Sequence, residues 1–142
     1  MPFDGGVAAA HTVILLGRRG RGARERAAID RAAARLRPLA LYPEPLDTRR
    51  VRILHVPWLF RLPWFRRFRG YNMAHLILLK HPLREVSDDL ITHELCHVWQ
   101  DQDHRLRVWA SYLKGYADNP HEREARRAAA VRPARPARSA RP

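Results

Sequence analysis

Apolar residues recur at helical spacing in several segments of the chain. In residues 23–36 they stand three and four positions apart, and Pro38 then ends the pattern. Residues 87–101 have the same periodicity, with a polar opposite side and Ser87 placed as a helix N-cap. These spacings predict two amphipathic helices, whose apolar stripes are Ile29, Ala32, Ala33 and Leu36 in the first and Leu90, Ile91, Leu95, Val98 and Trp99 in the second.

Two further helices are predicted toward the end of the chain. The polar run after Asp101 predicts a break, and apolar residues at helical spacing resume over 105–113. Asn119 followed by Pro120 is typical of an N-cap and a first helical position, which predicts a last helix over 120–130.

Three segments have the pattern of β-strands. Residues 11–16 are a short run of β-branched and leucine residues, and residues 49–56 alternate between apolar and basic positions. Residues 71–80 are apolar on both alternating faces, which predicts one strand covered on both sides. Together with the helices, these strands predict an α+β fold with a small mixed sheet.

The segments between and beyond these elements define the predicted organisation. Residues 57–70 mix two prolines, aromatic residues and arginines without a period, which is typical of a loop whose aromatic side chains cap the core. The arginine, proline and alanine repeats of 131–142 predict a disordered basic tail. We therefore expect a short strand or poorly ordered segment with a basic connector over 1–22, and one domain over 23–130.

The chain is strongly basic. Its 142 residues have a formal net charge of +13, and all but two of the 27 basic residues are arginine. The arginines are spread along the chain together with many alanines and prolines. Part of this charge therefore reflects a general compositional bias rather than one binding patch. The alternative explanation is an anionic partner, either nucleic acid or another anionic surface.

Nothing in the sequence predicts a membrane span or a secretory signal. The apolar patch at 13–16 is too short to cross a bilayer, and arginines follow it rather than precede it. Cys96 is the only cysteine, so no internal disulfide is expected. These features favour a cytoplasmic protein.

One motif carries the chemistry of the chain: His93-Glu94-Leu95-Cys96-His97, an H-E-x-x-H pattern inside the second predicted helix. Residues four apart lie one turn above each other on a helix, so His93 and His97 can bind a single metal ion. Zn²⁺ suits two imidazoles with one further N or O donor and an open position for water. Glu94 is then placed to reach that water.

The third metal ligand has several candidates. Glu122, in the last predicted helix, shares its face with small alanines that would let two helices approach closely, and Glu124 is the alternative. Glu122 also stands three residues after Asn119, where it could instead complete a capping box. Asp103 is a weaker candidate. In the metzincin pattern, which places a third ligand at that position, a glycine stands where this chain has Gln100.

The H-E-x-x-H motif is followed by Glu122, 25 residues after His97, and by Ala125. This combination resembles the motifs of the gluzincin metallopeptidases. The small size of the chain is similar to that of the minimal members of that group. The resemblance implies a zincin-like fold in which the strand over 71–80 runs beside the active-site cleft and pairs with an extended peptide. Arg126 departs from the pattern, because the family has at this position an aspartate that supports the first histidine.

The leading prediction is a zinc-dependent metallopeptidase that hydrolyses peptide bonds of a peptide or protein substrate. His93, His97 and Glu122 would bind Zn²⁺, and Glu94 would be the general base. A donor for the developing oxyanion is also required, and the sequence offers three candidates: Tyr112, Tyr116 and His121.

Two alternatives come from other functional classes. The first is a basic nucleic-acid-binding protein with a structural or vestigial metal site, suggested by the net charge, the arginine-aromatic segment 57–70 and the basic tail. The second is an inactive zincin fold that serves as an interaction module.

Overall fold

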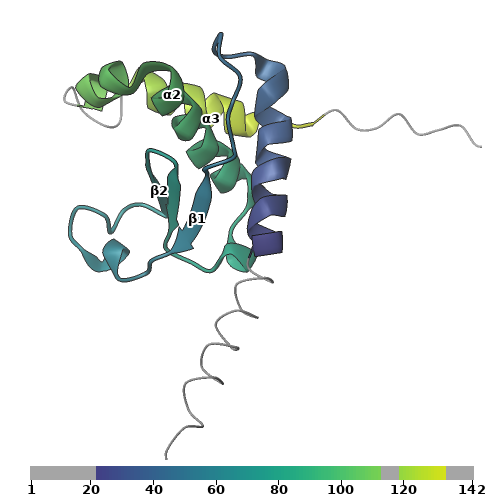
Figure 1. Ribbon diagram of the computed structural model, residues 1–142. Coiled ribbons are helices and arrows are strands. Elements are labelled where there is room, and N and C mark those ends of the chain that lie inside the picture. Colours follow the sequence, from purple (N-terminus) through teal and green to yellow (C-terminus); the bar gives the residue numbers. More distant parts are fainter. Residues whose placement is uncertain (1–21, 113–118, 134–142) are drawn as a thin grey trace, which may run out of the picture.

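The computed structural model describes residues 22–112 and 119–133, and the side chains of 22–103 and 119–133. This part of the chain contains three α-helices and a three-stranded mixed sheet, so the fold is mixed α and β. The helices are residues 22–36, α2 (Asp88–Tyr112) and α3 (Pro120–Ala130), and the strands are β1 (Arg52–His55), β2 (Gly70–Met73) and β3 (Leu76–Leu79). Short 3₁₀ helices follow the first helix and precede β2 and α2, at Arg37–Leu39, Leu59–Arg61 and Leu83–Glu85. In Figure 1 the helix 22–36 stands to one side, the sheet lies opposite, and α2 and α3 cross above it.

The sheet has the strand order β1-β3-β2. β3 pairs in parallel with β1 and antiparallel with β2, so it is the central strand and β2 is an edge strand. Ile77, Leu78 and Leu79 of β3 are all buried, which agrees with the prediction that this segment is covered on both faces. The strand predicted over 49–56 is present in its central part as β1.

The single strand predicted over 71–80 is wrong, because this segment is a hairpin of β2 and β3. Met73 pairs with Leu76, which leaves Ala74 and His75 as a two-residue turn. Ala74 adopts a left-handed conformation with φ of 53°. Turns of this kind usually contain glycine or asparagine, so an alanine gave no turn signal in the sequence.

The break predicted after Asp101 is also wrong, because α2 continues without interruption for 25 residues. No glycine or proline occurs between its ends, and a polar run alone does not stop a helix that is already formed. The predicted beginning is correct: Ser87 Oγ accepts a hydrogen bond from Leu90 N at 3.3 Å, as an N-cap does. α3 has the predicted bounds, and the Asn119 side chain accepts from His121 N.

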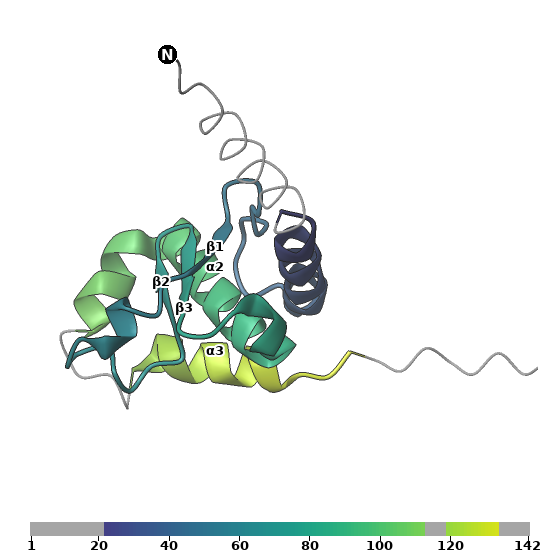
Figure 2. The ribbon, with the colours of Figure 1, turned by 90° about the horizontal axis from the view of Figure 1, so that it is seen from below.

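The core lies where the three helices and the sheet meet. Its centre is α2, whose apolar side packs against the helix 22–36, β3 and α3 (Figure 2). The apolar stripe predicted for 23–36 is buried as expected. The buried residues that form this cluster are Ile29, Ala32, Ala33, Leu36, Leu46, Val51, Ile77, Leu79, Ile91, Leu95, Cys96, Val98, Trp99, Ala125 and Ala128.

One arginine joins the three helices at their ends. The guanidinium of Arg35 donates to Asp89 Oδ1 at 2.9 Å, in the first turn of α2, and to the carbonyl of Ala129 at the end of α3. Arg132 also contacts Asp89, at 3.4 Å. This nearly buried arginine therefore holds α3 in place relative to the start of α2.

The segment between β1 and β2 forms a compact projection that we call the aromatic lobe, residues 57–69 (Figure 1). Phe60 is buried, and the ring of Phe65 makes edge contacts with the rings of Phe60, Phe68 and Tyr71. The phenylalanines thus behave as the sequence predicts for a loop that caps the core. The tryptophans do not, because Trp58 and Trp64 are exposed.

The predicted strand over 11–16 and most of the predicted basic tail lie outside the described residues; of the tail, residues 131–133 continue from α3 without regular structure. Within the described part of the chain, no helix is long and apolar enough to cross a membrane.

Candidate metal centre and cleft

The two histidines of the motif lie one turn apart on α2 and direct the same ring atom toward one point. His93 Nε2 and His97 Nε2 are 3.1 Å apart, and the two rings are nearly perpendicular, at 86°. His97 is buried, whereas His93 is half-buried and reaches the surface of a cleft. The apolar side of α2 is fixed in the core, so the helix presents both imidazoles from a rigid support.

α3 supplies a carboxylate to the same point. Glu122 Oε2 lies 3.0 Å from His97 Nε2, and Glu122 Oε1 lies 3.2 Å from His93 Nε2. Its side chain is 3% exposed, although it is in the first turn of α3. Ala125 and Ala129, on the same face, are buried against α2, which lets the helices approach as the sequence predicted. The capping-box alternative is not needed, because the carboxylate is directed to the imidazoles.

The spacing of these three side chains fits a small metal ion. Each offers one ligand atom, and these atoms all lie within 4.8 Å of one another. Zinc bound tetrahedrally at 2.0–2.1 Å would hold its ligands about 3.3 Å apart, so the observed 3.0–3.2 Å needs only a small expansion. Two imidazoles and a carboxylate are also a donor set that zinc accepts. Asp103 is not a member of this cluster.

Gln100, one turn beyond His97, fixes the orientation of that imidazole. Its amide oxygen lies 2.8 Å from His97 Nδ1, and its amide nitrogen donates to the carbonyl of His121 and to Glu124 Oε2, both at 2.9 Å. The two bonds of the nitrogen determine which end of the amide faces the histidine. His97 Nδ1 must then carry the proton, which leaves the Nε2 lone pair free to bind a metal.

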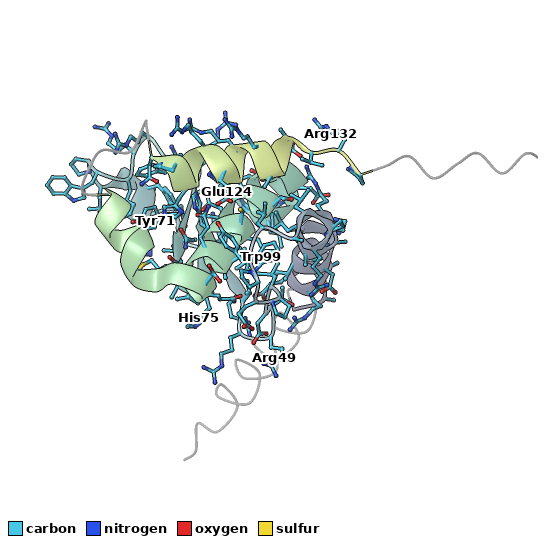
Figure 3. All side chains as sticks on the ribbon, turned by 90° about the horizontal axis from the view of Figure 1, so that it is seen from above. Arg49, Tyr71, His75, Trp99, Glu124 and Arg132 are labelled. Atoms are coloured by element: carbon cyan, nitrogen blue, oxygen red, sulfur yellow. The ribbon has the colours of Figure 1, made fainter. Side chains whose placement is uncertain are left out.

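Glu124, the alternative third ligand, is not in the cluster. Its carboxylate accepts hydrogen bonds from Gln100 and from the hydroxyl of Tyr42, and in Figure 3 it lies on the inner side of α3. Burial, together with the hydrogen bond to Glu124, raises the pKa of Tyr42, so this hydroxyl remains a donor. The chain Tyr42–Glu124–Gln100–His97 therefore gives Glu124 an indirect role in orienting a ligand.

Glu94 lies beside the cluster, and a glycine makes room for it. The carboxylate is buried, yet it borders the same cleft as His93. Gly70, at the start of β2, packs directly against it: a Cβ at this position would lie 3.0 Å from Glu94 Oε1 and 3.2 Å from its Cγ. Only a residue without a side chain fits there unless Glu94 moves.

The charged groups of the site shift one another's protonation. Burial raises the pKa of Glu94, while the two histidines oppose that shift. Burial lowers the pKa of His97, but the hydrogen bond to Glu122, the charge of Glu94 and the bond to Gln100 outweigh it, so the net shift is upward. The pKa of Glu122 is far below the usual range, because hydrogen bonds and charges of the histidines overcome its burial. These opposite shifts favour a shared proton between His97 Nε2 and Glu122 in the metal-free protein, and a metal ion bound at this point would replace that proton.

The cluster opens into a cleft of about 950 Å³. Residues 67–70 form one wall, the segment before α2 and its first turn form another, and α3 forms the third. This volume is at the upper end of the range of about 300–1,000 Å³ that is typical of ligand sites. The strand beside the cleft is β2, rather than the whole segment 71–80.

Arg126 takes part in the site differently from the aspartate expected there. Its Nε lies 3.3 Å from Glu122 Oε1, and its side chain lines the cleft. Of the candidates for an oxyanion donor, His121 does not line the cleft, and its carbonyl binds Gln100. Tyr116 and the side chain of Tyr112 lie outside the described residues.

Two contributors were missed at the sequence level. Gly70 carried a signal, because a glycine beginning a strand often marks a close approach of another group. Gln100 carried none, since its function depends on Tyr42 and Glu124, which come to it from distant parts of the chain.

Comparisons with known proteins identify no relative: no family model, curated protein or solved structure matches this chain.

Proposed function

We propose that the protein is a zinc-dependent metallopeptidase with a zincin-like arrangement of its active site. The observation that carries the proposal is the convergence of His93, His97 and Glu122 on one point, with Glu94 beside it at the wall of a cleft. The three donors come from two helices that are fixed to each other, and a buried amide orients one of them. Such support is typical of sites in which ligands hold a metal for catalysis.

His93, His97 and Glu122 would hold a zinc ion, which would act as a Lewis acid, lowering the pKa of a bound water to about 7 and polarising a carbonyl. Glu94 accepts the proton of the attacking water and delivers it to the leaving amine. Its carboxylate borders the cleft together with His93, which suits this exchange because a general base must lie within reach of the water that it deprotonates. Gly70 leaves room for the Glu94 carboxylate in this position.

The substrate in this proposal is an extended peptide that lies along the cleft beside β2. Among the described strands, β2 is an edge strand that pairs only with β3, and its first residue contacts the proposed base. An edge strand can form main-chain hydrogen bonds with an added peptide strand. A peptide bound in this way would have its scissile bond near Glu94 and the proposed metal ligands.

The first test is the metal content of protein purified without added metal. We expect about one zinc per chain by mass spectrometry, and loss of that zinc in His97→Ala. His75→Ala is the matched control, because it removes an exposed histidine in the β2–β3 turn and leaves all three proposed ligands and their supporting hydrogen bonds in place. Wild-type protein without zinc that also fails to bind added Zn²⁺ would exclude the proposal.

The second test separates metal binding from catalysis. Glu94→Gln keeps the size of the side chain and removes the base, so we expect bound zinc and a loss of peptide hydrolysis of about 10²-fold or more. Activity is measured on a peptide library with zinc-loaded protein. Equal turnover in wild type and Glu94→Gln would show that Glu94 is not the base.

A further inference from the structure

The aromatic lobe exposes apolar side chains that the core does not use. Trp58 is 64% exposed, Trp64 is 75% exposed, and Leu62, between them, is 41% exposed. Each tryptophan follows a proline, Pro57 or Pro63, at a turn. The chain thus has two Pro-Trp corners on one projection.

These exposed tryptophans are held on a rigid base. Phe60 is buried, and Phe65 packs against Phe60, Phe68 and Tyr71 with ring centroids 5.1–6.5 Å apart. Main-chain hydrogen bonds within the lobe, such as Phe65 N to Leu62 O at 3.0 Å, close its turns. The phenylalanines therefore fill the inside of the lobe, and the tryptophans remain at its surface.

The electrostatic character of this part of the chain selects an anionic partner. No acidic residue occurs between Asp47 and Glu85, and this stretch contains eight arginines and one lysine. Arg61 and Arg66 lie in the lobe itself and are exposed. A second copy of the chain would bring like charges together, so charge complementarity argues against a homodimer here.

We propose that the aromatic lobe docks the protein on a membrane surface containing anionic lipids. Tryptophan side chains favour the interface between headgroups and acyl chains, and arginines bind lipid phosphates. Leu62 supports this choice over single-stranded nucleic acid, because an aliphatic side chain gains by insertion into lipid and does not stack on a base. The lobe also extends to one side of the molecule in Figure 1, as a docking surface requires.

Docking at the lobe would bring the cleft close to the bilayer. Arg67 and Phe68 belong to the lobe and also line the cleft, in the same wall as Gly70. A ligand of the cleft would then bind near the membrane surface. The docking proposal itself depends only on the lobe, so it does not require the peptidase activity.

The test compares binding of the full chain to two kinds of vesicle, phosphatidylcholine alone and an equal mixture of phosphatidylcholine and phosphatidylglycerol. We expect binding to the mixture only, because each arginine at an anionic surface strengthens binding about five-fold. The variant Trp58→Ala/Trp64→Ala retains every charge and should bind about 100-fold more weakly, at about ten-fold for each inserted tryptophan.

The matched control is Arg49→Gln/Arg50→Gln, which removes two exposed arginines outside the lobe. It should weaken binding less than the tryptophan variant does. An equal or greater loss in this control would mean diffuse electrostatic attraction and would overturn the proposal, as would absence of binding to the anionic vesicles. Tighter binding to oligo-dT than to vesicles, lost in the tryptophan variant, would overturn it in favour of single-stranded nucleic acid.

A measurement on the wild-type protein does not depend on whether the variants fold. Lipids with brominated acyl chains should quench the tryptophan emission of vesicle-bound protein, because Trp58 and Trp64 would reach the bromines while Trp99 stays buried in the core, and the same quenching in Trp109→Phe assigns it to the lobe. Bound protein with unquenched emission would overturn insertion of the lobe.

Discussion

Replacing Gln100 by methionine tests whether the amide that holds His97 matters to the metal. Gln100 is 1% exposed and makes three hydrogen bonds, to His97 Nδ1, the His121 carbonyl and Glu124. Methionine has a similar length and fills the same space, but it cannot reproduce these bonds. The three proposed metal ligands remain unchanged, so any loss of affinity comes from the orientation and basicity of His97.

The expected losses follow from those contacts. Removing a hydrogen-bond partner of a metal-bound histidine typically lowers metal affinity 10- to 100-fold, or by about 1.4–2.8 kcal/mol. The metal-free fold should also lose about 3 kcal/mol, because the His97 N–H and the His121 carbonyl are left buried without this partner, at about 1–3 kcal/mol each.

The assay is competition between the protein and a chelator for Zn²⁺ at neutral pH, under conditions in which both proteins are folded. Gln102→Met is the control: Gln102 is on the same helix but exposed, and its side chain binds the main chain of Asp47 instead of the site. We expect its zinc affinity to stay within about two-fold of wild type. Wild-type zinc affinity in Gln100→Met would refute the view that this amide organises the site.

Two further predictions concern protonation and space. Metal-free protein should lose thermal stability as the pH rises above about 6.5, because the raised pKa of His97 gives a stabilisation that is complete below the unfolded value and is lost as the pH passes the folded one. The depressed pKa of Glu122 stabilises the fold at all but strongly acidic pH, so it does not change this trend. Zinc affinity should rise with pH, because the metal competes with protons for its ligands. A melting temperature of the metal-free protein that increases from pH 6 to 8 would contradict this scheme. Gly70→Ala should leave zinc binding intact and lower kcat/KM for peptides about ten-fold or more, because the new Cβ would displace Glu94. Gly22→Ala, where the new Cβ meets nothing within 4 Å, is its control, and equal activity in the two variants would show that the position of Glu94 is not critical.

The sequence predicted most of what local chemistry determines. Ser87 and Asn119 mark the beginnings of α2 and α3, because a side chain that accepts from the first main-chain N–H groups acts over only two or three residues. The pair of histidines on one face also follows from helical spacing alone. Glu122 rather than Glu124 lies beside the two histidines, and the small alanines on its face are buried as the close approach to α2 requires; its role as a metal ligand stays a prediction.

What the sequence did not predict depends on contacts between distant residues. The hairpin of β2 and β3 was missed because Ala74 adopts a conformation that residue type alone does not indicate. The continuity of α2 does not follow from the polar residues after Asp101, because a polar run resembles a helix end even where no glycine or proline interrupts the helix. The role of Gln100 could not be predicted because its partners come from α3 and from the segment around Tyr42, which are distant from it in the sequence.

The two-residue turn at Ala74 and His75 also limits where residues can be inserted or deleted. It sets the register of β2 on β3, and that register places Gly70 opposite Leu79 and against Glu94. Inserting or deleting one residue in the turn would shift β2 by one position and reverse its faces. Tyr71 or Arg69 would then stand where even a Cβ crowds the Glu94 side chain. Length variation should therefore be tolerated within the aromatic lobe far better than in this short turn, although the turn lies well away from the metal ligands in the sequence.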